Sequence, residues 1–308
     1  MARTSAFGLG LALAGALILT PDALLMRVSG MDGFQMLGWR GMCMGVIFMT
    51  AWALTASNHR ADLARLAGPT AALVILCHAL NASLFPLGIA ISPVAPVLLG
   101  VATVPVWSAL LARLLHGEAT STATWVAITL VMAGLAYAVT DTGDAALDPA
   151  SLIGAACGLG VALALALNFV TLRHHPDLPL LPVIGIGALI AGAAGWTLTG
   201  PAQMAQGHLW AILTASIVIL PLSFFALSQA SRYTAAANVS LLLLLETVLA
   251  PIWVWLGTGE APSRRMVIGG TIVVLTLAVY VLRARRVRGL ASRAPLPNTA
   301  PRQTTPDS

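Results

Sequence analysis

Three ionisable side chains, Asp22, Arg40 and Glu246, lie inside long apolar stretches of the chain. A charge near the centre of a bilayer costs about 2.5–3.5 kcal/mol on insertion scales, so such residues usually face a cavity or a partner. Glu246 is the deepest of the three. We expect its carboxyl group to exchange a proton with a cavity or to pair with a cationic group of a solute. A structural ion pair, or a protonated carboxyl hydrogen-bonded within its helix, is the alternative.

Arg40 and Asp22 lie nearer the ends of their apolar stretches. The planar guanidinium of Arg40 suits bidentate binding of a carboxylate or phosphate, although its long stem could instead carry the charge to the interface. Asp22 follows Pro21 and could be either a binding residue or an interfacial cap. With Arg40 and Glu246 offering opposite charges, the sequence favours a zwitterionic, amino-acid-like solute.

Two further side chains, His78 and Asn81, are three residues apart and therefore share one face of a helix. His78 is a candidate because imidazole titrates near neutral pH, and a hydrogen-bonded packing histidine is the alternative. Trp253 lies two turns beyond Glu246, faces the same way, and could stack on an organic cation or mark the membrane interface. No further His, Cys or carboxylate stands at ligand spacing, so we expect no metal site, no catalytic set and no cofactor.

The composition defines the elements that must position these residues. Hydrophobic residues make up 58% of the 308-residue chain and charged residues 9%, whereas soluble domains carry about 25% charged residues. This excludes a soluble enzyme, a disordered protein and a secreted disulfide scaffold, and it predicts a multi-pass membrane protein. The basic residues are all arginine, so the chain has no P-loop lysine for ATP hydrolysis. Arginines crowd the C-terminus after an apolar segment, which indicates a lipid-facing flank and no nucleic-acid partner.

A membrane-spanning helix needs about 20 apolar residues. Runs of this kind occur near residues 6–26, 34–56, 68–89, 93–115, 122–140, 150–172, 180–199, 209–230, 235–257 and 266–284. The arginines between the runs lie mainly on one side, and the positive-inside rule makes that side cytoplasmic. We therefore expect an all-helical protein of the cell inner (cytoplasmic) membrane with ten transmembrane helices and both termini in the cytoplasm.

The two halves of the chain contain the same short motif at corresponding positions. Gly117-Glu118-Ala119 follows the fourth run, and Gly259-Glu260-Ala261 follows the ninth. An odd number of helices per half places the copies upside down relative to each other, as in alternating-access transporters. The sequence thus predicts two inverted five-helix repeats, residues 1–145 and 146–286, and a disordered basic cytoplasmic tail at 287–308.

Small residues and prolines inside the runs predict where helices approach or bend. Gly41-x-x-x-Gly45 and Gly154-x-x-x-Gly158 indicate close helix packing. Pro105 and Pro251 lie inside the fourth and ninth runs, where proline is tolerated at cavities and helix contacts.

Three stretches give the chain a specific resemblance. They are Pro105–Trp107 continuing to Gly117-Glu118, Leu241–Glu246 continuing to Gly259-Glu260, and Asp32–Phe34 continuing to Trp39-Arg40-Gly41. Over residues 6–286 the chain resembles the drug/metabolite transporter superfamily, EamA type. The resemblance implies a ten-helix inverted-repeat fold and the export or import of small metabolites, and it specifies no substrate.

The sequence therefore predicts a secondary transporter, an exporter or permease, that moves a small polar or charged metabolite by alternating access. Its expected partners are this small-molecule solute and the lipid bilayer, with proton coupling and a homodimer as further expectations. An intramembrane enzyme is one alternative, and it would need a second buried acid–base group near Glu246. A membrane assembly protein that transports nothing is the other.

Overall fold

Long helices dominate the structure, a computed structural model that describes residues 2–92, 94–139, 149–259 and 264–291. Across these ranges the chain is all-helical, without strands. The helices are α1 (Ala2–Leu19), α2 (Asp22–Ser29), α3 (Gly33–Thr55), α4 (His59–Leu66), α5 (Pro69–Ile91), α6 (Val94–Ala102), α7 (Val104–His116), α8 (Thr122–Val139), α9 (Pro149–His174), α10 (Leu180–Thr199), α11 (Pro201–Met204), α12 (Leu209–Thr214), a π-helical turn η1 (Ala215–Ile219), α13 (Leu220–Tyr233), α14 (Ala236–Leu243), α15 (Leu245–Thr258) and α16 (Arg264–Ala291).

Eight helical segments within the described ranges are long and apolar enough to cross a membrane. They are Ala6–Ser29, Gly33–Thr55, Pro69–Ile91, Pro96–His116, Pro149–His174, Leu180–Thr199, Leu209–Tyr233 and Ala236–Gly257. Two shorter apolar helices, Thr122–Tyr137 and Val267–Arg283, coincide with the fifth and tenth predicted runs. These segments support the predicted multi-pass membrane protein.

Two of the predicted loop and tail segments fall partly or wholly beyond the described residues. The acidic loop at 141–148 and residues 292–308 of the tail lie outside them. The helix α16 continues to Ala291, past the predicted boundary at residue 286.

Three of the spanning segments are broken near their middle. The breaks lie at Thr20–Pro21 between α1 and α2, at Thr103 between α6 and α7, and at Leu244 between α14 and α15. Proline accounts for the first two breaks, because Pro21 and Pro105 lack a backbone donor. At the third break the amide of Leu244 donates to the carbonyl of Leu241, a tightened turn without proline. Each break redirects the side chains that follow it.

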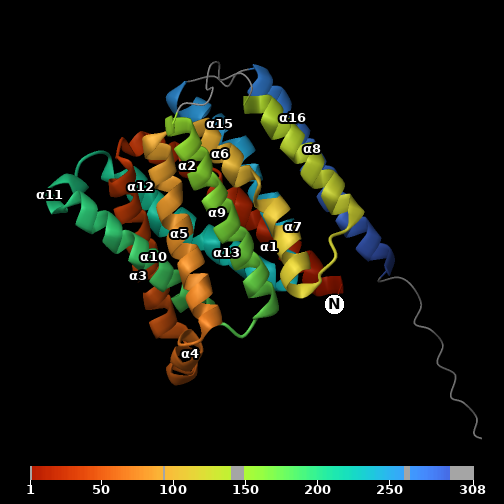
Figure 1. Cartoon of the computed structure of the whole chain (residues 1–308), viewed down its shortest axis with the longest axis horizontal. Coiled ribbons are helices and arrows are strands. Elements are labelled where there is room, and N and C mark those ends of the chain that lie inside the picture. The colour runs from red at the N-terminus through yellow and green to blue at the C-terminus, as the bar shows by residue number, and fades with distance from the viewer. Residues whose placement is uncertain (1, 93, 140–148, 260–263, 292–308) are drawn as a thin grey trace, which may run out of the picture.

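Most of the long helices pack side by side in pairs (Figure 1). α3 lies along α10, α5 along α9, and α1 along α13. α8 and α16 run side by side along one edge of the bundle. Pairing these helices gathers the middle of α5, α9 and α13 in the interior, where the core residues Phe169, Val170 and Leu227 are buried.

Glycines allow the closest of these approaches, as the sequence predicted. A side chain at Gly41 would overlap the backbone of Gly192 on α10, and one at Gly158 would overlap the carbonyl of Val97 on α6. Gly154 faces Ser92 in the same way, and Gly45 faces Leu189. Both glycine pairs therefore lie at helix contacts.

Candidate functional site

A cavity of about 80 Å³ lies inside the helix bundle, between the broken segments α1–α2 and α14–α15 and the helices α3, α5, α9 and α13. One water needs about 10–15 Å³ of such space, so the cavity can hold several waters or a small solute. Its polar lining comes from Asp22, Arg40, His78, Asn81 and Glu246. These are five of the six residues that the sequence proposed, and the fold brings them together from α2, α3, α5 and α15.

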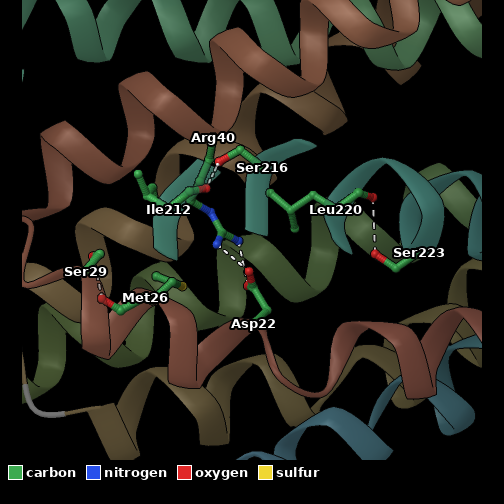
Figure 2. A network of polar contacts seen from close by, with 8 residues as sticks. All are labelled: Asp22, Met26, Ser29, Arg40, Ile212, Ser216, Leu220 and Ser223. Carbon is green, nitrogen blue, oxygen red and sulfur yellow. Dashed lines mark hydrogen bonds and ion pairs between the residues drawn. The ribbon is translucent and has the colours of Figure 1, made fainter. Parts of the chain in front are cut away.

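Asp22 and Arg40 form a bidentate ion pair at one wall of the cavity (Figure 2). Arg40 Nη1 donates to Asp22 Oδ1 at 2.6 Å, and Arg40 Nη2 donates to Asp22 Oδ2 at 2.8 Å. The side chains are only 2% and 13% exposed for Asp22 and Arg40. Parallel hydrogen bonds between a guanidinium and a carboxylate are among the strongest in proteins. Arg40 is therefore engaged by a protein carboxylate.

The local sequence explains where the Asp22 carboxylate points. Asp22 is the first residue of α2, directly after the break at Pro21, so it lies in the first helical turn. A carboxylate is favoured there by the helix dipole. Figure 2 also shows Ser216 of η1 beside Arg40, but its hydroxyl donates to the carbonyl of Ile212. The Arg40 side chain, on α3, thus has its carboxylate partner at the start of α2.

Glu246 follows the break between α14 and α15, as Asp22 follows the break between α1 and α2. It lies in the first turn of α15, two residues after Leu244, and its side chain lines the cavity. It is within electrostatic reach of Asp22 and Arg40, yet none of the hydrogen bonds or ion pairs among the described residues involves its carboxylate. With Asp22 and Arg40 compensating each other, an ionised Glu246 leaves the cavity with one net negative charge.

His78 contributes a buried imidazole to the cavity lining. Its side chain is 4% exposed, and its Nε2 atom has no hydrogen-bond partner in the described part of the chain. The imidazole packs edge-on against Phe224, with ring centroids 6.3 Å apart. Asn81, one turn further along α5, also lines the cavity and is 8% exposed. An unsatisfied polar atom beside a cavity indicates that water or a solute completes its hydrogen bonds.

Trp253 is the one candidate that the fold places elsewhere. Its indole nitrogen donates to the hydroxyl of Thr20 at 2.9 Å, its side chain is 40% exposed, and it is absent from the cavity lining. Two turns of α15 separate it from Glu246, a rise of about 10 Å. A shared helix face therefore did not bring the indole into the same cavity, and Trp253 fastens α15 to the end of α1.

Apolar side chains complete the cavity. Sequence reasoning identified one of them, Phe85, which lies one turn beyond Asn81 on the same helix face, and missed the others. Phe85, Phe169 and Phe224 contribute three aromatic walls, and Leu165 and Leu227 close the space between α9 and α13. The others resemble dozens of other apolar positions in the chain, so no local signal distinguished them. Among the described residues, no group of three His, Cys, Asp or Glu side chains is placed to hold a metal ion.

Comparison with known proteins identifies a similar fold but gives no information on function. No family model matches the sequence. No curated protein matches it either. Solved structures do match, and among them a crystal structure is similar with a TM-score of 0.74 and 18% identity, over 91% of this chain and 98% of that one. This similarity shows that the helical arrangement occurs in a solved protein of nearly the same extent.

Proposed function

We propose that the protein is a secondary transporter that moves a small polar or charged metabolite across the cytoplasmic membrane by alternating access. The observation that carries the proposal is the buried cavity lined by Asp22, Arg40 and Glu246. Ionisable groups are costly within a membrane and usually mark a solute or ion pathway. A cavity of this size between helices suits a small solute.

The pattern of helix contacts supports the ten-helix, inverted-repeat part of this proposal. If α8 and α16 are counted as the fifth and tenth spans, each span has a counterpart five spans later. The third span, α5, contacts the sixth, α9, and the eighth span, α13, contacts the first, α1. The pairs α3–α10 and α8–α16 each join a span to its own counterpart. Two repeats related by a twofold axis would give this pattern.

The helix breaks support a binding site between the repeats. Thr103 in the fourth span and Leu244 in the ninth stand 14 and 15 residues before Gly117 and Gly259. Interrupted helices at corresponding positions of two repeats are typical of transporter binding sites near the middle of the bilayer. Glu246 follows one of these breaks, and Val101 of the cavity precedes the other.

The ion pair narrows the kind of solute. Because Asp22 already engages Arg40, the carboxylate of an amino-acid-like solute finds no vacant guanidinium fork in this arrangement. Glu246 is the carboxylate left to attract a positive charge. We therefore propose that Glu246 binds either the protonated amine of a solute or a proton.

The two alternatives to transport predict different chemistry. His78 lies in the same cavity as Glu246, so a second acid–base group is present for an intramembrane enzyme. No Ser, Thr, Cys or Tyr belongs to the described cavity lining, however, so a covalent nucleophile of these types is absent from it. A membrane assembly protein would not need a carboxylate such as Glu246 that lines a cavity without a charged partner among the described residues.

Transport can be tested without knowing the solute. Purified protein is reconstituted into liposomes, an isotopically labelled extract of small cell metabolites is added outside, and the vesicle contents are analysed by mass spectrometry. We expect one or a few amine-bearing metabolites to accumulate above the level in protein-free liposomes. Accumulation of nothing above that level, with inward and outward gradients of protons both applied, contradicts the transporter proposal.

A further inference from the structure

The ionisable side chains of the cavity leave one charge for a solute. Arg40 donates both terminal nitrogens to the carboxylate of Asp22, and these side chains are only 13% and 2% exposed. Glu246 lines the same cavity, and none of the ion pairs among the described residues involves it. The described lining contains no other Arg, Lys, Asp or Glu. It therefore offers a solute one carboxylate and no vacant cationic side chain.

His78 and Asn81 add polar groups to the lining that carry no charge. The His78 ring packs against Phe224, and its Nε2 atom has no hydrogen-bond partner in the described part of the chain. A protonated imidazole there would be a buried cation without a counter-ion, which is costly, so the ring is neutral. The amide of Asn81 is neutral by its chemistry. Neither side chain supplies the opposite charge that a second ionic group of a solute would need.

Carbon walls make up the rest of the cavity. Phe85 of α5, Phe169 of α9 and Phe224 of α13 bring aromatic rings to it from three helices. Leu165 and Leu227 add branched aliphatic walls. A hydrocarbon body packed against these side chains is removed from water, which is favourable. The hydroxyl groups of a sugar or polyol would instead lose water without gaining partners, which is costly. Aromatic faces also attract an ammonium group.

The volume of the cavity limits the size of this hydrocarbon body. Because one water needs about 10–15 Å³, the cavity of about 80 Å³ admits about five to eight waters. A methylene or amine group is similar in size to a water molecule, so the solute has a similar number of non-hydrogen atoms. An amine with a short aliphatic chain meets this limit, whereas a nucleotide or an oligopeptide exceeds it.

We propose that the cavity binds a small monoamine with an apolar body. Its ammonium group pairs with the carboxylate of Glu246, and its hydrocarbon part packs among Phe85, Phe169 and Phe224. This inference rests on the transport function proposed above and names the class of its solute. An amino acid is disfavoured because its carboxylate meets no vacant cation, and a diamine because its second ammonium group meets no second free carboxylate. In the absence of an amine, Glu246 takes up a proton, which removes its uncompensated charge.

Binding by the purified, detergent-solubilised protein tests this class of solute without a transport measurement. A ligand that binds only the folded protein raises its melting temperature, so apparent affinities follow from melting curves over a range of ligand concentrations. The measurements are made at about pH 7, where an alkylamine is protonated. Two matched comparisons examine charge: isobutylamine with valine, which carries an added carboxylate, and butylamine with the diamine putrescine. Isobutanol is the uncharged counterpart of isobutylamine.

We expect both amines to raise the melting temperature. Each should bind with an apparent Kd at least about tenfold below that of its matched compounds, because burying an ionic group without a partner is costly. No shift with either amine overturns the proposal, and so does a smaller difference in either charged pair. An equal shift with isobutanol and isobutylamine overturns the role of the ammonium group.

Variants locate the binding within the cavity. Glu246→Gln should abolish the shift caused by the amines, because the amide carries no charge to pair with an ammonium group. Glu118→Gln is the control and should retain the shift, since Glu118 lies outside the cavity lining. Phe224→Ala enlarges the cavity and should move the preference from butylamine toward hexylamine. Parental binding by Glu246→Gln would mean that the amine binds elsewhere and that the proposal is wrong.

The liposome assay separates this inference from the transport proposal. Amine binding that depends on Glu246, without accumulation of any metabolite, overturns transport and leaves the amine site intact. Accumulation of an amino acid, an organic anion or a sugar in preference to amines overturns the amine class and leaves the transport proposal intact.

Discussion

Asp22 and Arg40 bind each other through two parallel hydrogen bonds, of 2.6 and 2.8 Å, directly beside the break in the first membrane span. The pair joins α2 to α3 and neutralises two charges at the wall of the cavity. It also leaves Glu246 as the carboxylate there without a partner among the described residues. Asp22 and Arg40 are therefore expected to stabilise the fold, and Glu246 is expected to bind the solute or a proton.

Removing one member of the pair should destabilise the protein. Asp22→Asn leaves the Arg40 guanidinium buried without its counter-charge, and breaking a buried pair in this way costs about 3–5 kcal/mol. We expect a clear fall in the melting temperature of the detergent-solubilised protein. Arg65→Gln is the control, because the exposed Arg65–Asp62 pair, at 3.6 Å, should contribute less than about 1 kcal/mol. The double variant Asp22→Asn/Arg40→Gln should recover part of the loss, and a double variant less stable than Asp22→Asn would contradict this account.

Glu246→Gln should separate folding from function. The amide keeps the shape of the side chain and removes its titration and its charge, so we expect a folded protein in the membrane with strongly reduced accumulation of the transported metabolite. Glu118→Gln is the matched control, since Glu118 lies at the end of α7 and pairs with Arg173 at 3.5 Å, away from the cavity. If Glu246→Gln transports at the parental rate across about pH 6 to 8, the carboxylate is structural and proton coupling at this residue is wrong.

Gly158→Leu and Gly154→Leu should lower the amount of folded protein. Side chains at these positions meet Val97 and Ser92, so the helices cannot keep their present approach. Gly10→Leu is the matched control, because a side chain built at Gly10 meets no atom within 4 Å. Fluorescence size-exclusion profiles of the three variants give the measurement. Normal profiles for all three would mean that α9 does not need this contact.

Trp253→Phe should alter stability slightly and leave solute binding unchanged. The substitution removes the hydrogen bond to Thr20, an interaction of about 0.5–1.5 kcal/mol, but touches no residue of the cavity lining. Phe224→Ala, which removes a cavity wall, should instead change the concentration dependence of uptake. If the two variants change uptake equally, Trp253 contributes to solute binding and this prediction is wrong.

Reporter fusions should place the two ends of the bundle in different compartments. We expect a reporter after Arg286 to lie in the cytoplasm and one inserted at 141–148 to lie on the opposite side, as the arginine distribution predicts. The enzymatic activity of alkaline phosphatase and the fluorescence of green fluorescent protein distinguish the compartments. If both reporters lie in the same compartment, the predicted number of membrane spans between the two sites is wrong by an odd number.

Composition and apolar run length determined the class of protein and the positions of the helical segments. A bilayer of fixed thickness demands about 20 apolar residues per crossing, and this constraint acts on each segment alone. For the same reason the rare buried charges at Asp22, Arg40 and Glu246 stood out without any knowledge of the fold. These features are local, and the sequence alone suffices for them.

The partners of those charges depended on the tertiary structure. The Asp22–Arg40 pair joins residues on different helices, and no spacing rule relates their positions. Trp253 and Glu246 share a helix face, yet the rise of the helix carries the indole past the cavity to Thr20. The apolar walls at Phe169 and Phe224 became recognisable only when α9 and α13 came together. Such relationships arise from how helices distant in sequence pack, and the breaks at Pro21 and Leu244 turn the side chains that meet there.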